Sequence, residues 1–511
     1  MYAWGWMSFS AFLVGAGLAI GLYTGEGIRG VDPFNISVFC WALAGLILIL
    51  AKAVCVEYWP WSDFLKGDVP CRSIGEMRAV TGIDEQVLLA VLLNLDRRKW
   101  PDQLSQQQCT RISFDIRPTT SGEHVLSIIS TGPARCYVNG ELVYTREQET
   151  DLSIETFYFF KSKIERRISY SMKAGIHYTL VLESWNTDPK ILNARPLYGK
   201  MFQGSALRFQ EYVDIPLRIQ EAVQAAKEAD YTVVCVGTTS EIESEGFDRD
   251  DFSLTPDEYT QVLAVAKANP RTILVNFTGS PVDLSDLVDK VPAIVQAWFP
   301  GQECGHSLAL ALSGEVEPSG RLPFSWPRKD EDNPSWGNFP CDDNLVVRYD
   351  EGLAVGYRYY DRPENPKPLF SFGFGLSYTK FEVTSAEAVK GALTGVHDTT
   401  SVAIEVQNVG GRPGATVLQI YMRSFAVETH KVGQKRPLKE LKDFQRVHLQ
   451  PGESKRVLVS LDKYAFSVYN TDKACWQLNA GMYRCQVGLS SEDLKQAIEL
   501  EVDTTFTWTG I

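Results

Sequence analysis

Y-T-V-V-C-V-G at residues 231–237 is an unbroken apolar run, and polar loop residues follow it at once. A strand that is apolar on both faces is typical of a parallel sheet covered by helices. Residues 219–229, just before it, have helical spacing. After it, T-P-D-E at 255–258 supplies a hydroxyl N-cap, a proline in the first turn and a glutamate able to close a capping box. Helix, strand and helix in this order indicate an open α/β unit.

The same alternation continues further along the chain. Apolar runs at 272–277 and 292–299 predict two more buried strands, and residues 303–312 have helical spacing. Strands joined by helical crossovers lie parallel in one sheet. We therefore expect an α/β sandwich domain over residues 211–378.

Segments rich in β-structure lie on both sides of this unit. Between 110 and 185, apolar and polar residues alternate and turn signals such as Asn139-Gly140 interrupt them, a pattern typical of hairpins. Residues 379–511 contain short strands at sandwich spacing, broken by Gly410-Gly411 and Pro451-Gly452. The fold class is therefore α/β plus all-β, and the last segment is expected to be an immunoglobulin-like β-sandwich.

The N-terminal fifth of the chain is apolar at its start. Residues 1–25 contain no charged side chain, and a second apolar run covers 36–51. About 20 apolar residues span a bilayer, so the first run is long enough and the second is marginal. Buried strands and helices give the same pattern. We treat 1–55 as an apolar, membrane-like segment and leave 56–105 unassigned, apart from an amphipathic helix expected around 84–95.

Composition and charge restrict the function classes. A chain of 511 residues, 44% hydrophobic and 22% charged, suits a globular protein; its size corresponds to about two to four domains. Its 63 acidic and 50 basic side chains give a formal net charge of -13, which disfavours nucleic acid as a partner. The ten cysteines lack the paired spacing of zinc or redox sites, and they leave the redox compartment open.

The loop after the strand at 231–237 is dense in carboxylates. Within eleven positions it holds Glu241, Glu243, Glu245, Asp248, Arg249, Asp250 and Asp251. Ligands of open α/β sheets gather beyond the carboxyl ends of the strands, so this loop is the first place to look for chemistry. A loop carboxyl near other carboxylates can have a raised pKa and act as a general acid. Composition alone favours the plainer interpretation, a solvated acidic loop.

Other candidate residues give weaker signals. His306 begins a helix with no second ligand at metal spacing, so capping or packing is favoured over metal binding. Asn276-Phe277-Thr278 matches a glycosylation acceptor but ends a buried strand, and Asn35-Ile36-Ser37 is the more accessible match. Aromatic residues in the α/β part are expected mainly to fill the core, with stacking on sugar rings as the alternative. They are Trp298, Phe299, Trp326, Trp336, Tyr357, Tyr359 and Tyr360.

Several strings together resemble the C-terminal half of family 3 glycoside hydrolases, the β-glucosidases, from about Ala222 to the C-terminus. These strings are E-S-E-G-F-D-R-D-D (243–251), V-N-F-T-G-S-P-V (275–282), P-S-G-R-L-P-F-S-W-P (318–327), V-G-Y-R-Y-Y-D (355–361) and P-L-F-S-F-G-F-G-L-S-Y-T-K-F (368–381). Residues 106–210 resemble the protective-antigen-type β module that some fungal members insert into the α/β domain. Residues 379–511 resemble the family's fibronectin type III-like domain.

The resemblance implies a chemistry. The family hydrolyses terminal non-reducing β-D-glucosyl residues with retention, using two carboxylates about 5–5.5 Å apart as nucleophile and acid/base. The string E-G-F-D-R selects Glu245 as the acid/base, with Glu243 as the fallback, while Asp248 and Arg249 shape the same loop. The resemblance implies β-glucosides or short β-linked oligosaccharides as substrates, and neither a metal nor an organic cofactor.

The second carboxylate of the family reaction, the nucleophile, has no counterpart that we can identify in this sequence. The family's nucleophile is an Asp in a Ser-Asp-Trp string of an N-terminal barrel that is largely missing here. Aligning Gly15-Ala16-Gly17-Leu18 with the family's Asn-Ala-Gly-Leu puts Ala3 at the nucleophile position, and a methyl group cannot attack an anomeric carbon. Residues 1–55 are then a barrel remnant or a membrane-like segment, and the α/β sheet lacks its first strands, which leaves it incomplete.

Two functions are compatible with a missing nucleophile. We expect a β-glucosidase-family hydrolase with impaired activity, and the alternative is a non-catalytic carbohydrate-binding or assembly remnant. The resemblance implies secretion, and association with a membrane through the N-terminal apolar runs is the alternative.

Overall fold

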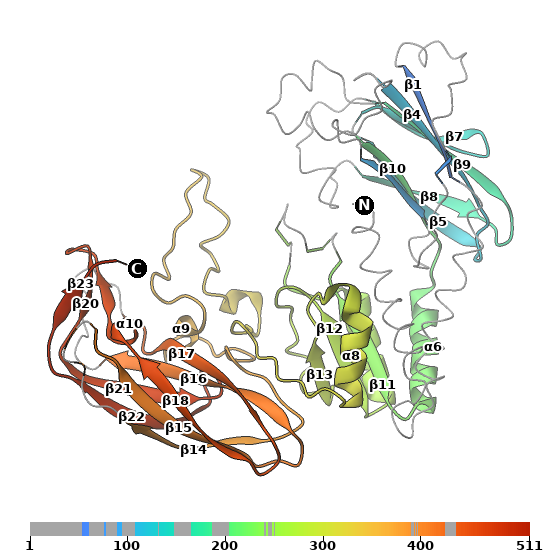
Figure 1. Cartoon of the computed structure of the whole chain (residues 1–511). Coiled ribbons are helices and arrows are strands. Elements are labelled where there is room, and N and C mark those ends of the chain that lie inside the picture. The colour runs from blue at the N-terminus through green and yellow to red at the C-terminus, as the bar shows by residue number, and fades with distance from the viewer. Residues whose placement is uncertain are drawn as a thin grey trace. The chain divides into compact units, whose positions relative to one another are not determined.

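The computed structural model places side chains and backbone in two compact units, each with its own hydrophobic core (Figure 1). The first unit comprises Met1–Ser280 and Leu287–Ala309, and the second comprises Pro281–Asp286 and Leu310–Ile511. The residues that the structure describes are 54–60, 76–77, 89–94, 108–130, 132–147, 165–185, 204–239, 242–243, 248–249, 251–389, 393, 395, 397–424 and 436–510.

The β module of the first unit consists of two antiparallel sheets, with strand orders β2-β1-β4-β9-β6-β7 and β3-β10-β5-β8. Alternate side chains of β4, β5, β6, β9 and β10 meet in one buried cluster that includes Ile112, Leu126 and Leu180. Period-two burial of this kind is what the alternating sequence predicts. The strands are β1 (Val54–Pro60), β2 (Glu76–Met77), β3 (Leu89–Asn94), β4 (Gln108–Ile116), β5 (Gly122–Ser130), β6 (Ala134–Val138), β7 (Glu141–Arg146), β8 (Arg166–Met172), β9 (Tyr178–Trp185) and β10 (Gly204–Gln210).

The predicted hairpin turn at Asn139-Gly140 is present between β6 and β7. Asn139 has a φ of 50° and Gly140 a φ of 82°, and positive φ at both central positions is the geometry of a type I′ turn. This turn matches the right-handed twist of the paired strands, which is why Asn-Gly predicts hairpins so well.

The helix expected around 84–95 is a wrong prediction. Residues 89–94 form strand β3, which pairs antiparallel with β10, so that Leu89 lies opposite Phe209 and Asn94 opposite Gly204. The run L-L-A-V-L-L at 88–93 is apolar throughout, and a short continuous run does not distinguish a buried strand from a helix. Residues 89–94 form a strand because they pair with β10, which lies more than one hundred positions further along the chain.

The α/β part of the first unit follows the predicted order of elements. Its sheet has the order β11-β12-β13 with all strands parallel, and Val233, Ile273 and Ala293 are in register across it. Helices α6 and α7 pack on each other, and α7 also contacts β11 and β12. The elements are α6 (Ile215–Glu228), β11 (Thr232–Gly237), α7 (Pro256–Ala268), β12 (Thr272–Phe277), β13 (Ala293–Gln296), the 3-10 helix η4 (Gly301–Glu303) and α8 (Cys304–Ser313).

Strand β11 is covered less evenly than its apolar sequence predicts. Val234 and Val236 are buried, whereas Val233 is half-buried and Cys235 is exposed. Successive side chains of a strand point to opposite faces, so the face that carries Cys235 is the less covered one. An apolar run therefore identified the strand correctly but overstated its burial.

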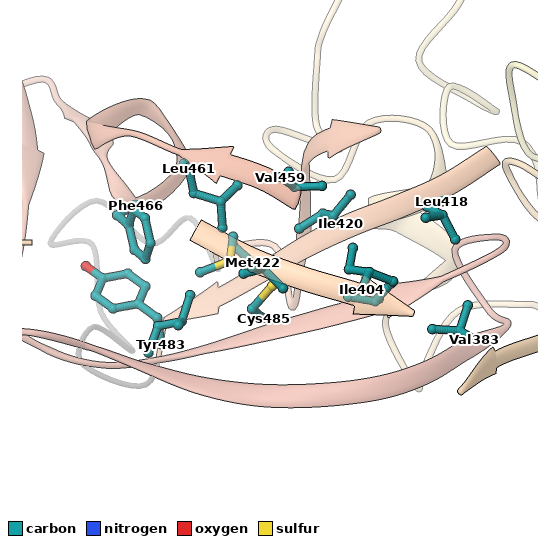
Figure 2. Close-up of a cluster of buried hydrophobic side chains, with 14 of the residues drawn as sticks. Val383, Ile404, Leu418, Ile420, Met422, Val459, Leu461, Phe466, Tyr483 and Cys485 are labelled. Atoms are coloured by element: carbon teal, nitrogen blue, oxygen red, sulfur yellow. The ribbon is translucent and has the colours of Figure 1, made fainter. Parts of the chain in front are cut away.

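The second unit is β-rich at its C-terminal end. Sheets β14-β15-β18 and β17-β16-β21-β22 contribute side chains to one core, of which Figure 2 shows Ile404, Leu418 and Tyr483 among others. A third sheet has the order β19-β20-β23. The elements are η5 (Asp330–Asp332), α9 (Tyr357–Tyr360), β14 (Phe381–Ala388), β15 (Thr400–Asn408), β16 (Gly414–Ser424), β17 (Glu440–Leu449), β18 (Ser454–Leu461), α10 (Lys463–Phe466), β19 (Val468–Asn470), β20 (Cys475–Leu478), β21 (Gly481–Gly488), β22 (Leu494–Val502) and β23 (Phe506–Trp508).

The aromatic residues of the α/β part, which were expected mainly to fill the core, differ in burial, and the expectation is wrong for two of the seven. Trp326 and Tyr360 are buried, at 1% and 4% exposure, but Phe299 and Trp336 are 45% and 55% exposed. The remaining three, Trp298, Tyr357 and Tyr359, are half-buried.

Within the described part of the chain, no helix combines the length and the apolarity needed to cross a bilayer.

Candidate active site

Three segments, two polar and one aromatic, follow the strands at the carboxyl edge of the parallel sheet. Thr238 follows β11, Gly279 and Ser280 follow β12, and Trp298 and Phe299 follow β13. The ladder extends slightly beyond the strands, because Thr238 N donates to Phe277 O at 3.1 Å. Parallel strands bring these ends to one side of the sheet, which is where ligands of open α/β sheets bind.

The carboxylate of Glu243 is the centre of a hydrogen-bond network at this edge. Its Oε2 accepts hydrogen bonds from Thr238 Oγ1 at 2.6 Å and from Gly279 N at 3.2 Å. Its Oε1 accepts one from Ser280 Oγ at 2.8 Å. Three donors from the ends of two neighbouring strands therefore hold one loop side chain, so Glu243 is suited to anchoring the loop.

Arg249 joins the same network from the other side of the loop. Its Nη1 donates to Ser280 Oγ at 3.0 Å, so this hydroxyl accepts from Arg249 and donates to Glu243. Asp248, next to it, is exposed. Further along, Asp251 Oδ1 accepts a hydrogen bond from Ser253 N at 2.8 Å, a local turn outside the network.

Glu258 holds both ends of the acidic loop. Its Oε1 accepts from Gly237 N at 3.0 Å, at the end of β11, and its Oε2 accepts from Thr255 N at 2.9 Å. Thr255 in turn caps α7, because its side chain accepts from Glu258 N. The predicted capping box is thus confirmed. Its glutamate has a second role that the local pattern does not reveal, because it also links Gly237, before the loop, to α7, after the loop.

The predicted site residues are only partly within the described chain. The structure brings Glu243 and Arg249 together through Ser280 and leaves Asp248 at the surface. The proposed acid/base Glu245 lies outside the described residues, as do Ala3, Asn35, Glu241 and Asp250.

Sequence reasoning missed Thr238, Gly279, Ser280 and Glu258 as parts of this site. Gly279 has a specific reason to be glycine, because a Cβ there would lie 2.6 Å from Phe299 Cε2 and 2.8 Å from Glu243 Oε1. The available signal was positional: three of the four residues lie within three positions of a predicted strand end. The contact between Glu243 and Ser280 could not be predicted, because no sequence motif relates these two positions.

The weaker candidates have plain structural explanations. Asn276 is fully buried, and its Nδ2 donates to Thr278 Oγ1 at 2.9 Å and to Gln296 Oε1 at 2.7 Å. Its amide is therefore engaged in the sheet, as its strand-end position predicts. His306 is half-buried in α8. Among the described residues, no group of three or more His, Cys, Asp or Glu side chains is arranged to hold a metal ion.

Comparison with known protein families assigns two segments of the chain. Residues 153–378 match the glycosyl hydrolase family 3 C-terminal domain, and residues 416–491 match the fibronectin type III-like domain. The first match begins inside the segment 106–210 that resembles the inserted β module. An open parallel sheet with an acidic loop at its carboxyl edge, followed by a β-rich domain, is thus the C-terminal part of a family 3 glycoside hydrolase. The chain belongs to this family.

Curated relatives and solved structures agree with this family. The chain is 36% identical over 402 residues to "Probable beta-glucosidase H" of Aspergillus clavatus, covering 78% of this chain and 47% of the relative. It is 38% identical over 409 residues to "Beta-glucosidase B" of Emericella nidulans, covering 77% and 46%. The chain thus spans about half the length of these relatives.

A solved β-glucosidase of Kluyveromyces marxianus in complex with glucose is similar in structure. The TM-score is 0.74 at 29% identity, and the match covers 90% of this chain and 51% of that one. A family 3 β-glucosidase of Bifidobacterium adolescentis gives a TM-score of 0.52 at 34% identity, covering 57% and 42%.

Proposed function

We propose that this chain carries the acid/base side of a β-glucosidase site, which acts on terminal non-reducing β-D-glucosyl residues of β-glucosides and short β-linked oligosaccharides. The observation that carries the proposal is the clustering of Glu243, Ser280 and Arg249 at the carboxyl edge of the sheet, on both flanks of the segment that contains Glu245. The relatives named as β-glucosidases support it.

In the family's two-step reaction the acid/base protonates the leaving oxygen and later activates water. In this proposal Glu245 holds that position and protonates the leaving oxygen, while Asp248 and Arg249 shape the loop. The nucleophile position falls on Ala3, so no covalent glycosyl-enzyme forms there. We therefore propose that hydrolysis by this chain is impaired by several powers of ten relative to a two-carboxylate enzyme.

Release of p-nitrophenol from p-nitrophenyl β-glucoside tests the acid/base assignment. We expect Glu245→Gln to abolish any turnover, whereas Asp251→Asn, which removes the same charge from the same loop, keeps it. Equal turnover in the wild type and in Glu245→Gln would refute the assignment. Strong wild-type turnover without an added nucleophile would refute the placement of Ala3.

Added azide tests the missing nucleophile directly. If a methyl group occupies that position, azide can attack the anomeric carbon from the vacant face and displace p-nitrophenolate in one step. The product is then α-glucosyl azide, because a single displacement inverts the configuration. β-Glucosyl azide would instead indicate a covalent intermediate and a second carboxylate.

A second candidate function, carbohydrate binding without catalysis, is favoured by one observation. Phe299 is 45% exposed and its ring packs against Gly279, beside the Glu243 network. Trp298, next to it, has a φ of 57°, and backbone strain of this kind often occurs at ligand sites. An exposed ring at a sheet edge can stack on a sugar.

Tryptophan fluorescence separates the two functions. Saturable quenching by cellobiose without turnover, weakened in Phe299→Ala, would favour the binding function. Absence of any saturable quenching would exclude it.

We propose that the protein is secreted, on the family resemblance alone, with attachment to a membrane through 1–25 and 36–51 as the alternative. Alkaline carbonate extraction of a membrane fraction tests this. Release of the chain into the supernatant would contradict a spanning anchor.

A further inference from the structure

The Ser280 hydroxyl joins two flanks of the acidic loop that are separate in sequence. It donates to Glu243 Oε1 at 2.8 Å and accepts from Arg249 Nη1 at 3.0 Å. Glu243 and Arg249 lie on opposite sides of residues 244–247, which include Glu245. Both bonds involve a charged group, and such hydrogen bonds are roughly twice as strong as those between neutral groups.

Two further contacts fix Glu243 to the sheet. Thr238 Oγ1 and Gly279 N both donate to its Oε2, one from the end of β11 and one from the end of β12. The backbone of the loop folds back here as well, because Ile242 N and Glu243 N both donate to Thr239 O, at 2.9 and 2.8 Å. The position of residue 243 is thus set from two strands and from its own turn.

We propose that Glu243 and Ser280 form a clasp that positions the segment carrying the acid/base. This inference rests on the proposed function, because it takes Glu245 as the acid/base. Glu243 and Ser280 are positioning residues: they act on the flanks of that segment. A displacement of about 1 Å at a reacting group can cost about 100-fold in rate, so a clasp of this kind controls kcat.

The clasp is separate from the contacts that hold the ends of the loop. Glu258 ties Gly237 to Thr255, and the capping box of α7 lies outside the Glu243 network. Loss of the clasp should therefore release the middle of the loop while the ends stay in place. This separation makes the clasp testable without unfolding the unit.

Hydrogen–deuterium exchange of the full chain tests the clasp. We expect Ser280→Ala and Glu243→Ala to speed exchange in peptides spanning 238–254 by about tenfold or more. Asp251→Asn is the matched control and should leave these peptides unchanged. Peptides from α6 and β12, which lie in the same unit as Glu243 and Ser280, report whether a variant is folded. Unchanged exchange in 238–254, or equal acceleration in all peptides, would overturn the clasp.

Measurement of kcat distinguishes a positioning role from a purely structural contact, because loss of a purely structural contact would leave kcat unchanged. With p-nitrophenyl β-glucoside, we expect the clasp variants to lower kcat about 10- to 100-fold with KM within about threefold. Glu243→Gln, which keeps one acceptor oxygen, should recover part of kcat. Faster exchange with unchanged kcat would overturn the positioning role. If the wild type shows no turnover even with added azide in place of the missing nucleophile, the acid/base proposal fails, and exchange alone decides whether the clasp holds the loop.

Discussion

His124 is a buried titratable residue whose two ring nitrogens are both used. Nδ1 accepts a hydrogen bond from Tyr212 N at 3.0 Å, so the proton is on Nε2, which lies 3.1 Å from Thr120 O. The ring is fully buried and stacks on Phe209. A neutral imidazole in this tautomer satisfies both neighbours, and a charged one would place an N–H against the amide of Tyr212.

Burial lowers the pKa of His124 below 6.5, although Glu211 and Glu123 act in the opposite direction. A lowered pKa in the folded state means that the unfolded chain binds the proton first as the pH falls. The stabilisation is therefore complete above pH 6.5 and is lost as the pH falls through the lower folded value.

We expect the first unit of the wild type to lose more stability between pH 7 and pH 5 than that of His124→Phe. The difference between the two proteins isolates this group, because other titrating groups are shared. Denaturant unfolding at each pH measures it. Parallel pH profiles would contradict the prediction.

Which site residues could be predicted depended on sequence separation. The carboxylates of the loop are visible in the sequence because they are adjacent, and the capping box is visible because its partners are three residues apart. The partners of Glu243 at Gly279 and Ser280 are 36 and 37 residues away. A hydrogen bond across that separation exists only once the sheet has formed, and no local pattern encodes it.

At the scale of elements, the strands and longer helices around the parallel sheet were all predicted, but not all of their bounds: β13 covers only 293–296 of the expected 292–299, and α6 begins at Ile215 instead of 219. The expected strand at 272–277 coincides with β12, and the expected T-P-D-E start coincides with α7. These elements carry local signals: caps, breaks and long apolar runs. Strand β3 lies in an apolar run that fits a strand and a helix equally well, and its pairing with β10 decides between them.

The start of α7 makes a quantitative prediction. We expect Thr255→Ala to destabilise the first unit by about 1 kcal/mol, the usual value of an N-cap. We expect Glu258→Ala to cost more, about 1–3 kcal/mol, because Gly237 N also loses its acceptor. Denaturant unfolding of both variants checks the order. An equal or smaller cost for Glu258→Ala would show that the bond to Gly237 contributes nothing to stability.

At the scale of the whole molecule, two separate cores mean that unfolding need not be a single transition. Sequence predicted the distribution of α/β and all-β regions, because periodicity changes along the chain. It did not predict which aromatic residues are buried. Trp326 and Trp336 each follow a serine, yet one is 1% and the other 55% exposed, because burial depends on the packing of distant segments.

The core of the fibronectin type III-like domain can be tested with two leucines. Leu418 on β16 is fully buried, whereas Leu458 on β18 is 61% exposed. We expect Leu418→Ala to cost about 2–5 kcal/mol, because it leaves a cavity. Leu458→Ala, the same chemical change at the surface, should stay within about 0.5 kcal/mol. Similar losses for both would contradict the burial pattern.

The uneven covering of β11 leaves the thiol of Cys235 exposed, where a reagent can modify it. Burial raises the pKa of the Cys136 and Cys485 thiols to about 12, so these groups stay protonated and inert at neutral pH. Cys235 instead lies at the surface, two residues before the amide that Glu258 holds. A maleimide dye attached there would sit on β11, two residues before the hydrogen bond from Gly237 to Glu258, and its fluorescence anisotropy would report on this edge of the sheet.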